Sequence, residues 1–146
     1  MSSSDPQAAL DMISDANRKL AQRAKAPGWY HYVLGLLVGG LAAVQAAGIP
    51  WNIAYYVVYG AGLWLLVRAY RRHTGMWIPG YRAGRTRWVA FSLAAVVGGI
   101  FLAAVIIDRR TGDHRAYLIA GALLAVATTI GGYVWEAAFR RDLGVS

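Results

Sequence analysis

The sequence predicts an all-α membrane protein: a bundle of four transmembrane helices preceded by an amphipathic N-terminal helix, with both termini in the cytoplasm. Three observations lead to this prediction. Hydrophobic residues make up 58% of the 146 residues and charged residues only 15%, whereas soluble domains carry about 25% charged residues. Four uncharged segments are each long enough for a membrane helix of roughly 20 residues. Basic residues gather on one side of the predicted spans.

Residues 1–27 are expected to form a separate cytoplasmic helix and a hinge. Pro6 suits the first turn of this helix, and Pro27-Gly28 suits the hinge. One weakly apolar stripe follows the helical spacing: Leu10, Ile13, Asn17, Leu20 and Ala24. Such a helix can lie on the membrane surface, pack on the cytoplasmic loop or bind another subunit, and the sequence leaves these three alternatives open.

The first two spans are predicted at residues 29–48 and 51–70. Residues 26–67 contain no Asp, Glu, Lys or Arg. This uncharged segment is long enough for two membrane helices. Pro50 lacks a backbone donor and disfavours helix at the residue before it. Together with Gly48, it predicts a tight turn between the two spans.

The third and fourth spans are predicted at residues 88–107 and 116–136, separated by the short polar segment 108–115. The transmembrane domain therefore covers residues 28–139, and residues 140–146 form a cytoplasmic tail. Only helices and closed barrels satisfy the backbone inside a bilayer. Because the alternation of a barrel strand is missing from the sequence, we expect helices.

The orientation follows from twelve basic residues on one side of the spans against three on the other. The three are Arg109, Arg110 and Arg115. The twelve are Arg18, Lys19, Arg23, Lys25, Arg68, Arg71, Arg72, Arg82, Arg85, Arg87, Arg140 and Arg141. The side richer in basic residues is normally cytoplasmic, so the N-terminus, the C-terminus and the central loop are predicted there. Thirteen arginines against two lysines suggest a bacterial chromosome, and hence the bacterial plasma membrane.

The central loop, RAYRRHTGMWIPGYRAGRTRW at residues 68–88, mixes arginines with aromatic residues. In a soluble protein this mixture would suggest nucleic-acid binding. No recognition fold fits between two membrane spans at this length, so we expect no nucleic-acid partner. We expect these side chains to contact anionic lipid headgroups instead. The predicted contacts are Arg71, Arg72, Arg82, Arg85, Arg87, Trp77 and Trp88.

Glycines recur inside the predicted spans, beginning with Gly35-x-x-x-Gly39. Small residues four apart let membrane helices approach closely, either within one chain or between subunits. The predicted packing positions are Gly35, Gly39, Gly40, Gly60, Gly62, Gly98, Gly99 and Gly131. A homo-oligomer is expected on this basis. The alternative is that some of these glycines are unwound backbone lining a transport path.

Few ionisable residues lie in the spans. Glu136 is predicted to pair with Arg140 four residues later, or else to act as a gate. His31 and His73 could both lie on the cytoplasmic side, but two histidines alone do not predict a haem site. Without cysteines the chain has no thiolate chemistry. Because catalytic and metal-binding motifs are also missing from the sequence, we expect no enzyme, cofactor or metal.

The stretch GWYHYVLGLLVGG, preceded by ALDMISDANRKLAQRAKAP, resembles small uncharacterised four-helix integral membrane proteins of actinobacteria. This resemblance implies a location and an architecture but no activity. Small multidrug-resistance transporters differ because they carry a glutamate in the first span. Dual-topology fluoride channels differ because the charge asymmetry here fixes one orientation.

These features predict a non-enzymatic membrane protein that acts by helix–helix association, as an accessory or regulatory subunit of a membrane or cytoplasmic partner. The alternative is a small homo-oligomeric channel or transporter with its path at a subunit interface.

Overall fold

The computed structural model describes residues 6–23, 26–75 and 85–142, without the side chains of residues 17, 20–23 and 85. The described residues contain helices and no strand. In chain order they are α1 (Pro6–Arg23), α2 (Gly28–Ala43), the 3-10 turn η1 (Val44–Ala47), α3 (Ile49–Thr74), α4 (Arg85–Thr111) and α5 (Arg115–Asp142).

Four helical segments of the described residues are long and apolar enough to cross a membrane, as many as the sequence predicts. They cover Gly28–Ala47, Ile49–Thr74, Thr86–Thr111 and Arg115–Asp142. Each of the last three extends beyond the predicted limits at both ends, because charged and polar side chains near a helix end do not stop the backbone hydrogen bonding.

The helix ends follow local backbone chemistry. Pro50 lies in the first turn of α3, where its missing N–H is not needed, and the Asn52 N–H donates to the Gly48 carbonyl at 3.1 Å. Gly75 ends α3 with φ +70°, a left-handed conformation that suits glycine. Asp108 accepts a hydrogen bond from His114 at 2.6 Å and thereby closes the turn between α4 and α5.

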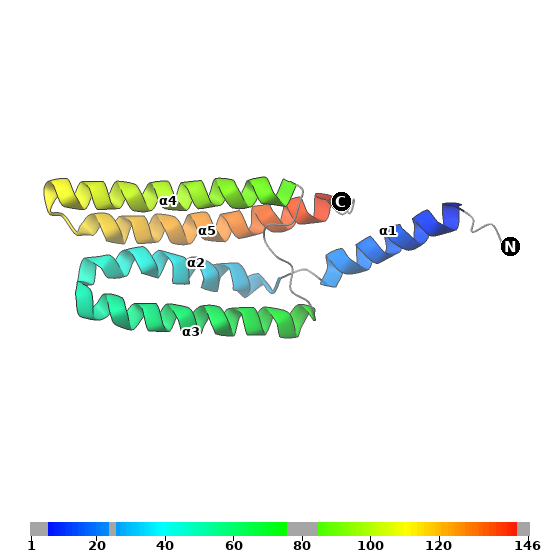
Figure 1. The fold of residues 1–146 in the computed structure, drawn as a ribbon, viewed down its shortest axis with the longest axis horizontal. Helices are drawn as coiled ribbons and strands as arrows, with labels where there is room; N and C mark the ends of the chain where they lie inside the picture. The colour runs from blue at the N-terminus through cyan, green and yellow to red at the C-terminus, as the bar shows by residue number, and fades with distance from the viewer. Residues whose placement is uncertain (1–5, 24–25, 76–84, 143–146) are drawn as a thin grey trace.

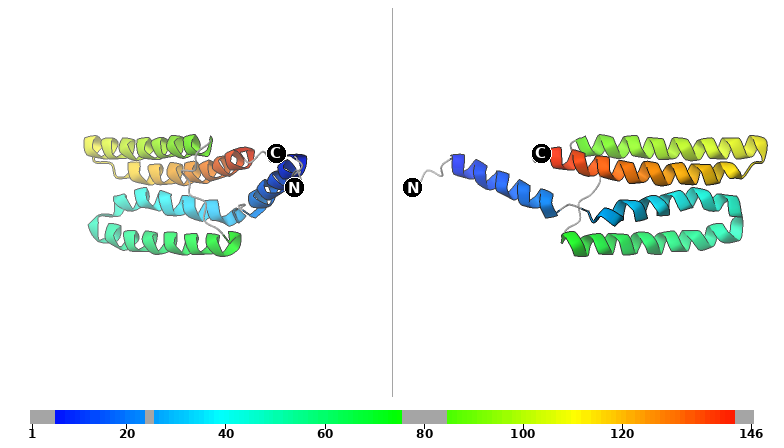
Figure 2. Two further views of the ribbon diagram at one scale, coloured as in Figure 1. Left: turned by 45° about the vertical axis from the view of Figure 1, so that its right-hand side comes forward. Right: turned by 180° about the vertical axis from the view of Figure 1, so that it is seen from behind.

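The four spanning helices form a single row in the order α3, α2, α5, α4 (Figures 1 and 2). Helix α2 packs on both α5 and α3, whereas α4 packs on α5. In the part of the chain that the structure describes, α3 and α4 do not pack along each other. The row therefore has two inner helices, α2 and α5, and two edge helices, α3 and α4.

One end of the row, here called the basic end, holds the starts of α2 and α4 and the ends of α3 and α5 (Figure 1). Helix α1 projects beyond this end and does not pack along the row (Figures 1 and 2). Leu10, Met12 and Ile13 of α1 are exposed. The three alternatives for this helix therefore remain as the sequence left them.

The two inner helices approach each other backbone to backbone at glycines. A Cβ added to Gly39 would lie 2.4 Å from the carbonyl oxygen of Gly121, and one added to Gly121 would lie 2.8 Å from that of Gly39. A Cβ added to Gly35 would meet the Ala125 carbonyl oxygen at 2.5 Å. The Gly35-x-x-x-Gly39 face is thus used inside the chain, against α5.

Glycines also admit the edge helices. The Tyr55 hydroxyl of α3 donates to the Leu37 carbonyl at 2.9 Å, directly over Gly40, where a Cβ would overlap the phenol. A Cβ on Gly62 would lie 2.9 Å from the side chain of Leu37. On the other side of the row, a Cβ on Gly131 would lie 2.7 Å from Leu93 of α4.

Gly60, Gly98 and Gly99 differ from the other predicted packing positions. No atom of the described residues lies within 4 Å of a Cβ added to any of these three. Among the described residues they make no close packing contact, and their use between subunits stays a prediction.

Replacing Gly39 with alanine should destabilise the fold, because the new methyl group meets backbone that cannot rotate away. We expect Gly39→Ala to lower the free energy of unfolding by about 1–3 kcal/mol. Gly60→Ala is the matched control, also a helical glycine in a span, and should be neutral or stabilising by up to about 1 kcal/mol. Detergent-induced unfolding of both variants, followed by near-UV circular dichroism, measures the difference. Equal effects would contradict the close approach of α2 and α5.

Candidate functional site

A cavity of about 640 Å³ lies on one face of the row, between the edge helices. It exists because α3 and α4 are separated by α2 and α5, which form its floor. The floor includes the polar side chains of His31, Thr128 and Glu136. One wall comes from α3, through Tyr59 and Tyr70. The wall from α4 consists of Val89, Ala90, Leu93, Ala94 and Val97.

His31 and Glu136 form an ion pair or hydrogen bond across the two inner helices. The imidazole Nε2 lies 3.1 Å from the carboxylate Oε2. The side chains are only 7% and 15% exposed. Helices α2 and α5 are antiparallel, so the first turn of α2 meets the last turns of α5 at the basic end. An ionisable side chain in an apolar span is costly alone, and pairing lowers that cost.

Neighbouring residues of α5 fix the position of His31. The Thr129 hydroxyl lies 3.2 Å from the His31 carbonyl and can donate to it. Gly132 leaves room for the imidazole, because a Cβ there would lie 2.3 Å from Nδ1. The ring of Tyr133 packs on the imidazole with 4.6 Å between centroids, and its hydroxyl donates to the Gly28 carbonyl at 3.1 Å.

Two polar atoms at the cavity floor lack a hydrogen-bond partner among the described residues. They are Nδ1 of His31 and Oγ1 of Thr128. His31 is 5% exposed and Thr128 is 6% exposed. Leaving a buried polar atom unpaired costs about 1–3 kcal/mol. Both atoms are themselves buried, and Nδ1 lies against Gly132 of α5, so this cost falls on the packing beneath the cavity.

The predicted pairing of Glu136 with Arg140 is wrong. In the described part of the chain, the carboxylate of Glu136 pairs with His31, and no ion pair joins it to Arg140, which is exposed. The imidazole lies in apolar surroundings at the helix interface. Electrostatic attraction between two partners is stronger there than at the water-exposed end of a helix. A gate role for Glu136 is untested.

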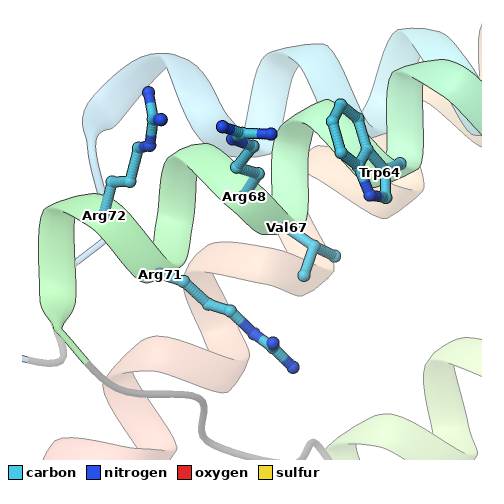
Figure 3. A pocket seen from close by; sticks show the side chains of 5 residues that line it. All are labelled: Trp64, Val67, Arg68, Arg71 and Arg72. Atoms are coloured by element: carbon cyan, nitrogen blue, oxygen red, sulfur yellow. The ribbon is translucent and has the colours of Figure 1, made fainter.

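A second pocket, of about 570 Å³, lies on α3 at the basic end (Figure 3). The Arg68 guanidinium lies over the Trp64 ring, 5.1 Å from its centroid. Arg68, Arg71 and Arg72 all line this pocket; Arg68 and Arg72 point to the same side of α3, whereas Arg71 points to another side (Figure 3). Two guanidinium groups beside an indole ring form a suitable surface for a phosphate group.

The other predicted lipid contacts are described only in part. On α4, Arg87 lies 5.9 Å from the centre of the Trp88 ring, and both side chains are exposed. Trp77 and Arg82 lie outside the described residues, as does the side chain of Arg85.

Sequence reasoning missed the cavity and the His31–Glu136 pair. Both residues were expected at the cytoplasmic ends of their spans, and the first and fourth spans were expected to be antiparallel. Together, these two expectations place both side chains at a similar depth in the membrane. This shared depth is the signal that could have indicated the pair. Nothing in the sequence states that the first and fourth spans are neighbours.

Two double-mutant cycles should show which residue, His31 or Arg140, interacts with Glu136. We expect a coupling energy of about 0.5–3 kcal/mol between His31→Ala and Glu136→Ala, because the two side chains are in contact. The matched cycle of Glu136→Ala with Arg140→Ala should give coupling near zero. Unfolding free energies of the five variants measure both values. Stronger coupling with Arg140 than with His31 would contradict the pairing described here.

Comparison with protein-family models, with curated proteins and with solved structures finds no match to this chain. The resemblance to actinobacterial membrane proteins therefore stays a prediction. The chemistry of the two pockets has to be argued from their own residues.

Proposed function

We propose that this chain is a non-enzymatic membrane subunit that acts by helix–helix association, in an accessory or regulatory role. One observation carries the proposal: a stripe of small residues on α4 is left uncovered. Ala95, Gly99 and Ala103 follow each other at intervals of four residues, and all three are exposed. A Cβ on Gly99 would meet no atom of the described residues within 4 Å. Such a stripe lets the backbone of another membrane helix come close.

The occupant that fits this stripe best is a second copy of the chain. Of the four spans, α4 has the smallest buried share, 6%. The basic residues favour one orientation in the membrane, so two copies would stand parallel. A two-fold axis along the membrane normal would then bring the stripe against itself, as in most homodimers. The proposed assembly is a homo-oligomer with α4 at its centre.

The proposed location is the bacterial plasma membrane, with the basic end on the cytoplasmic side. The charge asymmetry of the sequence supports this orientation. It places α1 in the cytoplasm, where its exposed Leu10, Met12 and Ile13 would be available to a partner protein or to the membrane surface.

The pocket of Trp64, Arg68 and Arg72 supports an anionic lipid as a further partner. In the proposed orientation it lies at the level of the inner-leaflet headgroups. Basic residues near such a surface contribute about 1 kcal/mol each to the attraction.

The second candidate is a small homo-oligomeric channel or transporter. The observation in its favour is the cavity with its His31–Glu136 pair, since paired ionisable residues inside spans often belong to transport sites.

Cysteine cross-linking can test the association, because the natural chain has no cysteine. We expect Gly99→Cys to form a disulfide-linked dimer in oxidised native membranes, since the stripe would place the two sulfurs together. Val97→Cys is the matched control, because Val97 lies on the side of α4 that packs on the core. Non-reducing gel electrophoresis measures the outcome, because a cross-linked dimer has twice the mass of the 15.8 kDa chain. A Gly99→Cys chain that stays monomeric would contradict the dimer.

Exchange of arginines can test the lipid site. We expect Arg68→Gln with Arg72→Gln to weaken retention of phosphatidylglycerol, because about 1 kcal/mol of attraction is lost per charge. Arg109→Gln with Arg110→Gln removes the same charge from two exposed residues at the opposite end. Native mass spectrometry counts the lipids retained by each variant. Equal losses in the two double variants would argue against a site on α3.

A further inference from the structure

We propose that the cavity between α3 and α4 binds a hydrophobic organic cation, with Glu136 as its counter-ion. This site is separate from the stripe on α4, so the proposal does not depend on the association of subunits. It rests on the carboxylate, the aromatic rings that line the cavity and the apolar walls.

The carboxylate of Glu136 can accept more than it receives. Among the described residues, its one hydrogen bond comes from Nε2 of His31. An ionised carboxylate has about four acceptor positions on its two oxygens. Glu136 also lines the cavity. A cationic group entering the cavity would therefore find acceptor positions that the protein does not fill.

A neutral imidazole would leave the His31–Glu136 pair with a net negative charge. One N–H of the imidazole, on Nε2, serves the carboxylate. Nδ1 is buried and faces no acceptor among the described residues, so a second N–H there would be left without a partner. The imidazole with a single N–H fits this environment, and the charge of the carboxylate is then not neutralised. A positive ligand would neutralise it.

Aromatic side chains lie beside this carboxylate. Tyr30, Tyr70 and Trp135 all line the cavity. The ring centroids of Tyr30 and Tyr70 are 5.3 Å apart. The His31 imidazole packs edge to face on Tyr30, with 5.5 Å between the ring centroids. The faces of such rings attract cations, more strongly where water is excluded. The aromatic rings and the carboxylate thus favour the same sign of charge.

The rest of the cavity suits an apolar body. Leu34 and Val38 of α2 and Leu93 and Val97 of α4 line it. Its volume of about 640 Å³ lies within the range of small-molecule sites, about 300–1,000 Å³. No lysine or arginine is among the described residues that line it. An anionic amphiphile would therefore meet a carboxylate without a compensating cation.

Two probes of the same shape and opposite charge provide the test: tetraphenylphosphonium and tetraphenylborate. We expect the full-length protein in lipid nanodiscs to bind the phosphonium saturably and the borate at least about tenfold more weakly, because only the cation is attracted by the carboxylate. Glu136→Gln keeps the shape of the side chain and should weaken phosphonium binding by about tenfold or more. Equilibrium dialysis measures both constants.

A second variant keeps the His31–Glu136 contact and blocks the space. Ala94 lines the cavity and is exposed, so Ala94→Trp should fill the cavity without disturbing packed neighbours. Ala61→Trp is the matched control, because Ala61 is an exposed alanine of α3 that does not line the cavity. Loss of phosphonium binding in Ala94→Trp alone would support the site. Equal binding by both tryptophan variants, equal affinity for the two probes, or unchanged affinity in Glu136→Gln would overturn it.

Discussion

The backbone contact between α2 and α5 determines how everything else in the row is placed. Gly39 meets Gly121, and four residues earlier in α2 Gly35 meets Ala125 and Thr129. The same antiparallel register, continued for one more turn, brings His31 against Gly132. Glu136 lies one turn beyond Gly132, within reach of the imidazole. The ion pair therefore depends on a glycine contact two turns away, because a side chain at Gly39 would separate the helices that carry its two partners.

The edge helices depend on the inner pair as well, since α3 is attached through α2 and α4 through α5. Tyr55 fixes α3 by donating to a carbonyl of α2 over Gly40. Leu93 fixes α4 over Gly131. These two attachments lie on opposite sides of the inner pair, so α3 and α4 are held apart. The cavity follows from this separation, and its polar floor is the part of α2 and α5 that neither edge helix covers.

The sequence was sufficient to predict the helices but not to predict which helices pack against each other. Uncharged length predicted four spans, and Pro50 predicted the first turn, because both signals act locally along the chain. Gly35 and Gly39 predicted a close approach, but spacing alone does not say whether the approaching helix is α5 or another subunit. Glu136 was assigned to Arg140 for the same reason: a partner four residues away is visible in the sequence, whereas His31, 105 residues away, is not. The cavity was not predicted at all, since it belongs to the arrangement of four helices and to no single segment.

The basic end of the molecule contains two surfaces that favour opposite charges, and the geometry of α3 keeps them apart. Tyr70 lines the cavity that contains Glu136. Arg68 and Arg72 are two residues before and after it, which is roughly 200° around the helix in either direction. Their guanidinium groups therefore lie on the far side of α3, beside Trp64 (Figure 3). The positive charges of Arg68 and Arg72 are thus directed away from the cavity. A surface suited to phosphate and a cavity suited to a cation can exist one helix diameter apart because each uses a different face of the same helix.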